Sequence, residues 1–541
     1  MTRPPASRSP WTSLLLAGSL ALPLGCSESP AKDDQTRSGA QGDDADGDGA
    51  DGDGADGDSS SSGTTGGSGK PAGKDGSTGS TSASNKDGGA TGSSTKDGGP
   101  SKGGDAGTPA GNNNPDSKPA SPDDTKAAAA ARVDNPFADA KGYVNPEWRE
   151  KALAEPGGER IASTPTAVWL DRTAAIEGTT NSMSNGAMGL ADHLDAALEQ
   201  GADYAIFVIY NLPGRDCSAL ASNGELGPDD LPKYKSEYID PIATIMGDAK
   251  YNKLRIINVI EVDSLPNLVT NTDVEQCAKM KANGGYVQGV SYALNRLGAL
   301  KNVYNYVDAG HHGWLGWDTN MNPSAELFAE TAKMAGFETV HGFITNTANY
   351  SALKEPFFDA NTSVGGTSVR MAKWVDFNFY VDELSFAQAF RDKLVSLGFD
   401  SKIGMLIDTS RNGWGGAGRP TAKSSATDVN TFVEQSRIDR RVHAGNWCNQ
   451  SGAGLGERPK ASPAQGIDAY VWIKPPGESD GASKMIQNDD GKGFDGMCDP
   501  SYGGNKRNGN SKTGALADAP LSGAWFSAQF QELMKNAYPS L

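Results

Sequence analysis

The second part of this sequence predicts an α/β fold in which parallel strands alternate with helices around a closed or nearly closed barrel. Apolar runs rich in β-forming residues recur at residues 167–170, 204–212, 254–260, 303–308, 339–344, 402–407 and 469–473. Helical patterns separate them, at residues 186–200, 235–248, 274–297, 325–335, 383–397 and 429–440. Alternation of this kind is typical of a parallel sheet, and seven strands suit a barrel. No glycine-rich phosphate loop follows any of these strands, so the pattern does not support nucleotide binding.

Composition divides the 541 residues into three parts. Residues 1–25 resemble an export signal, because two arginines precede an apolar run too short to span a bilayer. The run ends in Gly25-Cys26, which resembles a lipoprotein cleavage site and predicts lipidation of Cys26, with ordinary secretion as the alternative. Residues 26–132 are rich in Gly, Ser and Asp and nearly devoid of apolar residues, so we expect a disordered linker. Residues 133–541 have the composition of one large globular domain.

Charge and histidine content limit the partners of the protein. The net charge of −18 argues against nucleic acid and against anionic membrane surfaces. The sequence has five histidines and no HExxH motif, so we expect no catalytic metal and no cofactor. We expect a monomer whose only membrane contact would be a lipid on Cys26.

Acidic residues follow several of the predicted strands. Asp263 ends one of them between Val262 and Leu265, and such surroundings would raise its pKa as a general acid requires. The alternative is that Asp263 only caps the next segment. Further acids follow other strands, and a parallel barrel brings all strand ends to one face; these are Asp216, Asp308 and Asp480.

Cysteine and tryptophan positions add two expectations. Four cysteines lie in the globular part, and we expect disulfides between Cys217 and Cys277 and between Cys448 and Cys498. Tryptophans at strand ends and in loops offer flat faces to sugar rings, whereas Trp472, inside a strand, is expected to pack in the core. The expected sugar-binding tryptophans are Trp169, Trp314, Trp317 and Trp447.

Five ordered motifs together make the chain similar to a known family over residues 135–541. They are Asn211-Leu212-Pro213-Gly214-Arg215-Asp216-Cys217, Glu261-Val262-Asp263-Ser264-Leu265-Pro266-Asn267, Asp308-Ala309-Gly310-His311-His312-Gly313-Trp314-Leu315-Gly316-Trp317, Gly445-Asn446-Trp447-Cys448-Asn449 and Lys474-Pro475-Pro476-Gly477-Glu478-Ser479-Asp480-Gly481. They resemble glycoside hydrolase family 6, the inverting β-1,4-glucanases, whose fold is a distorted barrel of seven parallel strands. The chain departs from many fungal members at Val262, where they have Pro, and at Ser479, where they have Cys.

The resemblance implies a role for each matching position. Asp263 would be the general acid, Asp216 would keep its proton in place, and Tyr210 would press on the sugar at the cleavage point. Ser222 would hold the attacking water, and Asp480 would act as base through a second water. The remaining positions would bind cellulose or another β-1,4-glucan, with Arg411 paired to Asp480; they are Trp169, Asp171, Asp308, Trp314, Trp317, Asn349, Trp447, Lys474, Glu478 and Arg411.

Two long segments bear on the mode of attack. Residues 217–234 and 481–520 have little regular pattern, and long structureless loops in compact domains are usually functional. Endoglucanases of the family shorten these segments, so their retention resembles bacterial exoglucanases that release cellobiose from the non-reducing end. An endo-acting glucanase and a non-catalytic glucan-binding protein are the alternatives.

Overall fold

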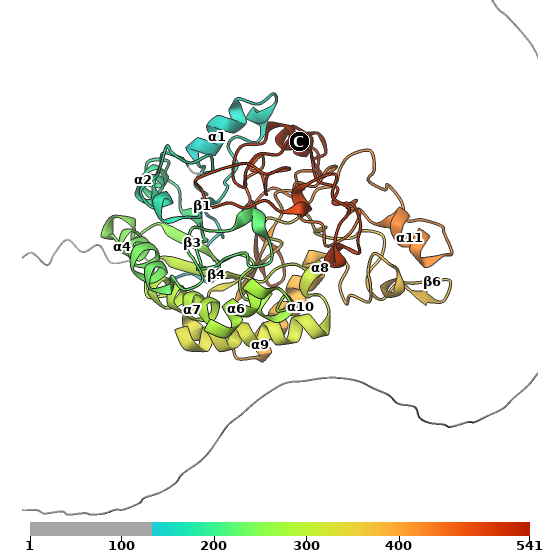
Figure 1. Cartoon of the computed structure of the whole chain (residues 1–541), viewed down its shortest axis with the longest axis horizontal. Coiled ribbons are helices and arrows are strands. Elements are labelled where there is room, and N and C mark those ends of the chain that lie inside the picture. The colour runs from blue at the N-terminus through green and yellow to red at the C-terminus, as the bar shows by residue number, and fades with distance from the viewer. Residues whose placement is uncertain (1–131, 185) are drawn as a thin grey trace, which may run out of the picture. The chain divides into compact units, whose positions relative to one another are not determined.

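The computed structural model describes residues 132–184 and 186–541. The predicted export signal, Cys26 and all of the predicted linker except Arg132 lie outside the described residues. All seven predicted strands are present and pair in parallel, in the order β1-β2-β3-β4-β5-β8-β10. Figure 1 labels β1, β3 and β4 of this sheet. Their bounds are Val168–Leu170 (β1), Tyr204–Ile209 (β2), Arg255–Ile260 (β3), Val303–Asp308 (β4), Gly342–Thr345 (β5), Gly404–Asp408 (β8) and Ile467–Val471 (β10).

The sheet curls into a barrel that is joined only loosely at its seam. One backbone hydrogen bond, from the N–H of Ala167 to the carbonyl of Trp472 (3.1 Å), links the segments that bear β1 and β10. The prediction missed β9 (Lys460–Ala464), which pairs antiparallel with β10 at the sheet edge. This strand is short, partly exposed and contains Pro463, so it lacks the apolar run that marked the others.

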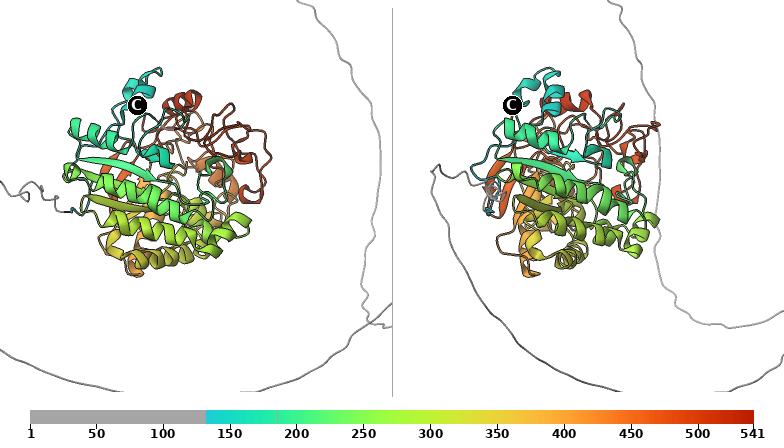
Figure 2. Two further views of the ribbon diagram at one scale, coloured as in Figure 1. Left: turned by 60° about the vertical axis from the view of Figure 1, so that its left-hand side comes forward. Right: turned by 90° about the vertical axis from the view of Figure 1, so that its left-hand side faces the viewer.

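Helices cover the outside of the barrel, as the two rotated views show (Figure 2). The α-helices are Pro146–Leu153 (α1), Leu190–Glu199 (α2), Leu231–Lys233 (α3), Asp240–Met246 (α4), Asn267–Thr270 (α5), Glu275–Asn283 (α6), Gly285–Gly298 (α7), His312–Leu315 (α8), Asp318–Ala335 (α9), Glu383–Ser396 (α10), Val429–Ser436 (α11) and Ser527–Lys535 (α12). The single helix expected over 274–297 is wrong, because Gly284 adopts φ +68° and divides it into α6 and α7. A π-helical turn, Tyr234–Ile239, precedes α4, and α1 and α12 were not predicted.

The central strands are buried on both faces, which explains their continuous apolar character. Every residue of β2 is buried, and in β3 only Arg255 is partly exposed. Phe207 and Ile209 face the cluster under the helices, whereas Ile206 and Val208 fill the barrel interior. This packing fixes the strand ends from which the acidic residues project.

One excursion departs from the barrel between β5 and α10. It contains the hairpin of β6 (Ser363–Val364) and β7 (Thr367–Ser368), and with α11 it forms a hydrophobic cluster of its own around Phe432. Figure 1 shows β6 and α11 standing out at one side of the molecule.

Candidate active site

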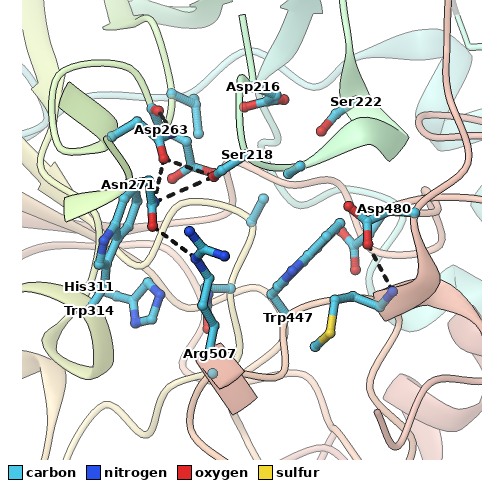
Figure 3. Close-up of a pocket in the computed structure, with 18 of the residues that line it drawn as sticks. Asp216, Ser218, Ser222, Asp263, Asn271, His311, Trp314, Trp447, Asp480 and Arg507 are labelled. Carbon is cyan, nitrogen blue, oxygen red and sulfur yellow. Dashed lines mark hydrogen bonds between the residues drawn. The ribbon is translucent and has the colours of Figure 1, made fainter. Parts of the chain in front are cut away.

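A cavity of about 860 Å³ lies at the carboxyl ends of the strands. It brings together predicted residues from segments far apart in the sequence, some of which are drawn in Figure 3. The predicted residues that line it are Trp169, Asp171, Tyr210, Asp216, Ser222, Asp263, Trp314, Trp317, Asn349, Trp447, Lys474, Glu478 and Asp480. Asp308 and Arg411 do not line it.

Asp263 reaches the cavity from a sharp turn at the end of β3. Glu261 and Asp263 both have left-handed backbones, with φ of +47° and +56°, which residues other than glycine adopt uncommonly. Asp263 is partly exposed and forms no ion pair within the described part of the chain. Burial in the cavity, with the charges of Asp308 and Asp216, raises the pKa of Asp263 well above its usual value. A raised pKa keeps a carboxyl protonated to higher pH than an ordinary aspartate, as a proton donor requires.

Asp216 is the second acid, and it also has a positive φ, of +52°. The hydroxyl of Tyr210 donates a hydrogen bond to Asp216 Oδ2, and the guanidinium of Arg215 lies 4.2 Å from the centre of the Tyr210 ring. Burial raises the pKa of Asp216 to about 6, while hydrogen bonding with Ser222 and Tyr210 opposes this rise. Asp216 is therefore largely ionised at neutral pH, and its charge contributes to the raised pKa of Asp263.

Asp308 lies beneath Asp263 instead of in the cavity. It is buried, and its Oδ2 accepts hydrogen bonds from the backbone N–H groups of Asp263 (3.1 Å) and Gly310 (3.2 Å). Burial raises its pKa to about 7. Asp308 thus holds the Asp263 turn in place and adds negative charge close to it.

Asp480 is held by a dense set of donors. Arg411 Nη1 lies 2.8 Å from Oδ1 and 2.9 Å from Oδ2, and Oδ2 also accepts from the Tyr350 hydroxyl (2.6 Å) and the Asn449 N–H (2.8 Å). The expected pairing of Arg411 with Asp480 is present. Arg411 is fully buried behind Asp480, so it supports that carboxylate and does not reach the cavity.

The predicted sugar-binding tryptophans all line the cavity, and three of them are fixed by their ring N–H groups. Trp169 donates to the Ile473 carbonyl (2.8 Å), Trp314 to the Thr270 hydroxyl (2.8 Å), and Trp317 to the Asp376 carbonyl (2.7 Å). The fourth, Trp447, precedes Cys448. Trp472 is buried in the core, as expected. The indole faces of the first three are therefore held at fixed positions.

Charged residues gather at the Trp169 end of the cavity. Lys474 Nζ lies 5.0 Å from the centre of the Trp169 ring, and burial lowers its pKa. Asp171 pairs with Lys492 at 2.8 Å, and the charges of Lys492, Arg215 and Arg172 hold the pKa of this buried carboxyl well below its usual value. Burial raises the pKa of Glu478. The site thus offers both donors and acceptors to polar groups of a ligand.

The two long loops meet at the cavity, and both predicted disulfides are present. The N–H of Leu220 donates to Asp495 (2.9 Å), and that of Gly493 donates to the Leu220 carbonyl (3.0 Å). Farther along, Arg507 pairs with Asp273 (2.7 Å), as does Lys506. The Cys448–Cys498 bond ties the same segment to the loop that carries Trp447. Residues 493–507 are therefore held both to the loop around Leu220 and to the segment that carries Asp273.

Sequence reasoning missed several residues of the site. Glu261 is buried and accepts hydrogen bonds from the Tyr234 hydroxyl (2.7 Å) and the Leu212 N–H (3.2 Å), which joins the strand ends that carry Asp216 and Asp263. Burial raises its pKa to about 7. Its place two residues before Asp263 was a usable signal. Two residues that line the cavity, Lys492 and Trp374, were also missed. They lie in irregular segments, where no periodicity indicates which side chains face the cavity.

Comparison with known proteins agrees with this architecture. The family model described as "Glycosyl hydrolases family 6" matches residues 137–537. Exoglucanase A of Cellulomonas fimi is 50% identical over 438 residues, which cover 76% of this chain and 49%, about half, of that protein's own length. A 1,4-beta-D-glucan cellobiohydrolase of Podospora anserina is 36% identical over 391 residues, covering 72% of this chain and 81% of that protein.

Solved structures show the same relationship. The catalytic domain of Cellulomonas fimi Cel6B has a TM-score of 0.73 and 49% identity, covering 76% of this chain and 97% of that one. Cellobiohydrolase II of Humicola insolens, in complex with glucose and cellotetraose, has a TM-score of 0.58 and 32% identity, covering 75% of this chain and all of that one. The fold, the matched span and these identities together show that the chain is a glycoside hydrolase belonging to glycosyl hydrolase family 6.

Proposed function

We propose that this protein hydrolyses β-1,4-glucosidic bonds of cellulose with inversion and releases cellobiose from the non-reducing chain end. The main support for this proposal is the state of Asp263. Its carboxyl is partly exposed, and its pKa is raised by burial and by two neighbouring acids. No basic side chain of the described residues forms an ion pair with it. Tryptophan faces in the same cavity supply stacking surfaces for a glucan chain. The relatives named as an exoglucanase and a cellobiohydrolase support the same activity.

In the proposed reaction Asp263 protonates the glycosidic oxygen as the bond to the anomeric carbon breaks. A water molecule placed beside Ser222 attacks that carbon from the opposite side, as a single displacement requires. Asp216 stays ionised, and its charge keeps the proton on Asp263 until the bond breaks. The proton lost by the water passes through a second water to Asp480, since the oxygens of Asp480 are already engaged by Arg411, Tyr350 and Asn449.

The test of the acid is the Asp263→Asn variant assayed on cellulose. Because Asn has the same shape and donates no proton to the leaving oxygen, the rate should fall about 10²–10⁴-fold with binding retained. Asp392→Asn is the matched control, since Asp392 has a side chain 81% exposed on α10. Retained turnover by Asp263→Asn would remove Asp263 from the acid role. Retained binding by a wild-type protein that releases no sugar would favour the non-catalytic alternative.

Attack from the chain end is supported by the contacts between the two loops. The segment 493–507 is hydrogen-bonded to Leu220, ion-paired with Asp273 and disulfide-bonded to Cys448, so several contacts hold it beside the cavity, which favours a substrate that enters by threading. Carboxymethylcellulose viscosity distinguishes the modes, because internal cuts shorten chains far faster than they release sugar. Viscosity should fall slowly relative to sugar released, and a rapid early fall would support the endo-acting alternative.

We also propose that the protein is exported and is held at a cell surface by lipidated Cys26 through residues 26–132. The globular part, residues 133–541, would then act on glucan outside the cell. No helix in the described part of the chain is long and apolar enough to cross a membrane. Mass spectrometry of the mature N-terminus tests the anchor; a free protein that starts at another residue would contradict it.

A further inference from the structure

The excursion between β5 and α10 presents aromatic side chains beside the cavity. Phe377 is 57% exposed and Phe379 is 39% exposed, and the other phenylalanines of the described residues are more deeply buried. Met371 (57%) and Val442 (57%) are exposed as well. Phe377 and Phe379 lie two residues apart on one turn, and clustered exposure of large apolar side chains indicates an interaction site more strongly than a single exposed residue does.

The turn that carries these rings is held rigidly in an unfavourable backbone conformation. Asp376 and Phe377 have φ of +49° and +60°, although neither is glycine. Arg370 fixes the turn, with its Nη2 donating to the Phe377 carbonyl (2.7 Å) and its Nε to the Asn378 carbonyl (3.0 Å). The same guanidinium lies 3.7 Å from the centre of the Phe379 ring. A strained backbone of this kind persists only where the surrounding contacts hold it in place.

The turn is continuous with the lining of the cavity. Trp317 donates its ring N–H to the Asp376 carbonyl (2.7 Å), and the N–H of Phe379 donates to the Gly316 carbonyl (3.1 Å). Trp374, from the same excursion, lines the cavity together with Trp317 and Asp376. Trp317 and Trp374 in the cavity and the two phenylalanines outside it are therefore carried by segments that are hydrogen-bonded to each other.

We propose that Phe377 and Phe379 form an external binding platform for the part of a β-1,4-glucan chain that lies outside the cavity, beyond Trp317. The apolar faces of successive glucose rings would pack on the two phenylalanines, while Trp374 and Trp317 hold the part of the chain inside. The position of the turn supports this, because it is hydrogen-bonded to Trp317, which lines the cavity, and its exposed rings offer apolar surface of the kind that sugar faces pack on. The inference rests on the proposed function and adds to it a second contact region for long or insoluble substrate.

The test compares long and short substrates with the full chain and its Phe377→Ala/Phe379→Ala variant. Retention on insoluble cellulose, measured in an Asp263→Asn background to prevent turnover, should weaken about tenfold for the loss of two aromatic contacts. Hydrolysis of cellotetraose by the same double variant with Asp263 intact should stay within about twofold of wild type, because neither phenylalanine lines the cavity. A Leu198→Ala/Met334→Ala variant, at exposed apolar positions on α2 and α9, is the matched control.

Three results would overturn the inference. Unchanged retention on cellulose would show that the rings do not touch substrate. The proposed function is tested separately, by comparing the activities of the wild type and the Asp263→Asn variant. An equal loss with the control variant would show a general effect of surface apolarity. A wild-type dimer by light scattering that becomes a monomer in the double variant would assign the patch to a second copy of the chain.

Discussion

At the scale of single residues, the site depends on carboxyls placed in positions that do not favour ionisation. Asp216 and Asp263 take left-handed backbones at the strand ends, and Asp308 is buried beneath Asp263. Burial raises the pKa of Asp216 to about 6 and of Asp308 to about 7. Because the groups interact, their protons leave in steps that belong to the cluster, and neutralising one acid changes the titration of the others.

The Asp308→Asn variant tests this coupling. Loss of the Asp308 charge removes one cause of the raised pKa of Asp263, so that pKa should fall. Since Asp263 acts in its protonated form, activity is lost as pH rises through its pKa. The alkaline limb of the kcat/KM profile should therefore move to lower pH, by about one unit. The introduced amide oxygen can still accept the Asp263 N–H, and an unmoved limb, with Asp392→Asn as reference, would contradict the proposed coupling.

Many of the residues that line the cavity could be predicted from the sequence, and the exceptions have physical reasons. Strand-end acids were predictable because parallel strands gather their ends at one face. Asp308 and Arg411 were expected to bind substrate, yet the structure buries both behind other acids. Sequence indicates that a charged residue lies near a site, but packing decides whether it faces the ligand or supports a neighbour.

At the scale of elements, the segment 481–520 supplies part of the cavity lining. Its contacts with Asp273 come from Lys506 and Arg507, whose side chains are 72% and 40% exposed. The Nε of Arg507 also donates to Asn271 Oδ1 (3.0 Å), and Figure 3 shows this pair at the cavity. Exposed ion pairs contribute little to global stability, but here they hold one loop against a wall.

Asp273→Ala should loosen this contact without unfolding the protein. We expect the melting temperature to remain within about 2 °C, because exposed ion pairs add little to stability. Viscosity loss of carboxymethylcellulose per sugar released should rise several-fold as internal cuts become accessible. Asp195→Ala, which breaks the exposed pair of Asp195 with Lys250 (2.9 Å), is the control. Unchanged viscosity behaviour would show that the Asp273 contact does not limit access.

Regular elements were easier to predict than these loops. The seven parallel strands were found because burial on both faces gives continuous apolar runs. The loop contacts over the cavity, the β9 edge strand and the position of Trp374 could not be found, since irregular backbone has no periodicity that tells inward from outward residues. Cysteines were the exception, because Cys498 indicated that the long segment is tied down.

At the scale of the whole molecule, the barrel supplies the framework and its strand-end loops supply the chemistry. The strands place Asp263, Asp216 and Asp480 around one cavity, while the excursion between β5 and α10 extends that cavity with aromatic residues. Fold class followed from the alternation of strands and helices. The loose seam between β1 and β10 could not be predicted from the sequence, because closure of the barrel depends on contacts between the two ends of the domain.

The proposed reaction is a single displacement in which Asp263 protonates the leaving oxygen and water attacks the anomeric carbon from the opposite face. Proton NMR of cellobiose released from cellohexaose, recorded before the anomers equilibrate, tests it most directly. The first product should carry the α configuration at the new reducing end, because one displacement at a β bond inverts the carbon. Cellobiose that first appears as the β anomer would show two displacements through a covalent intermediate and would contradict the single displacement.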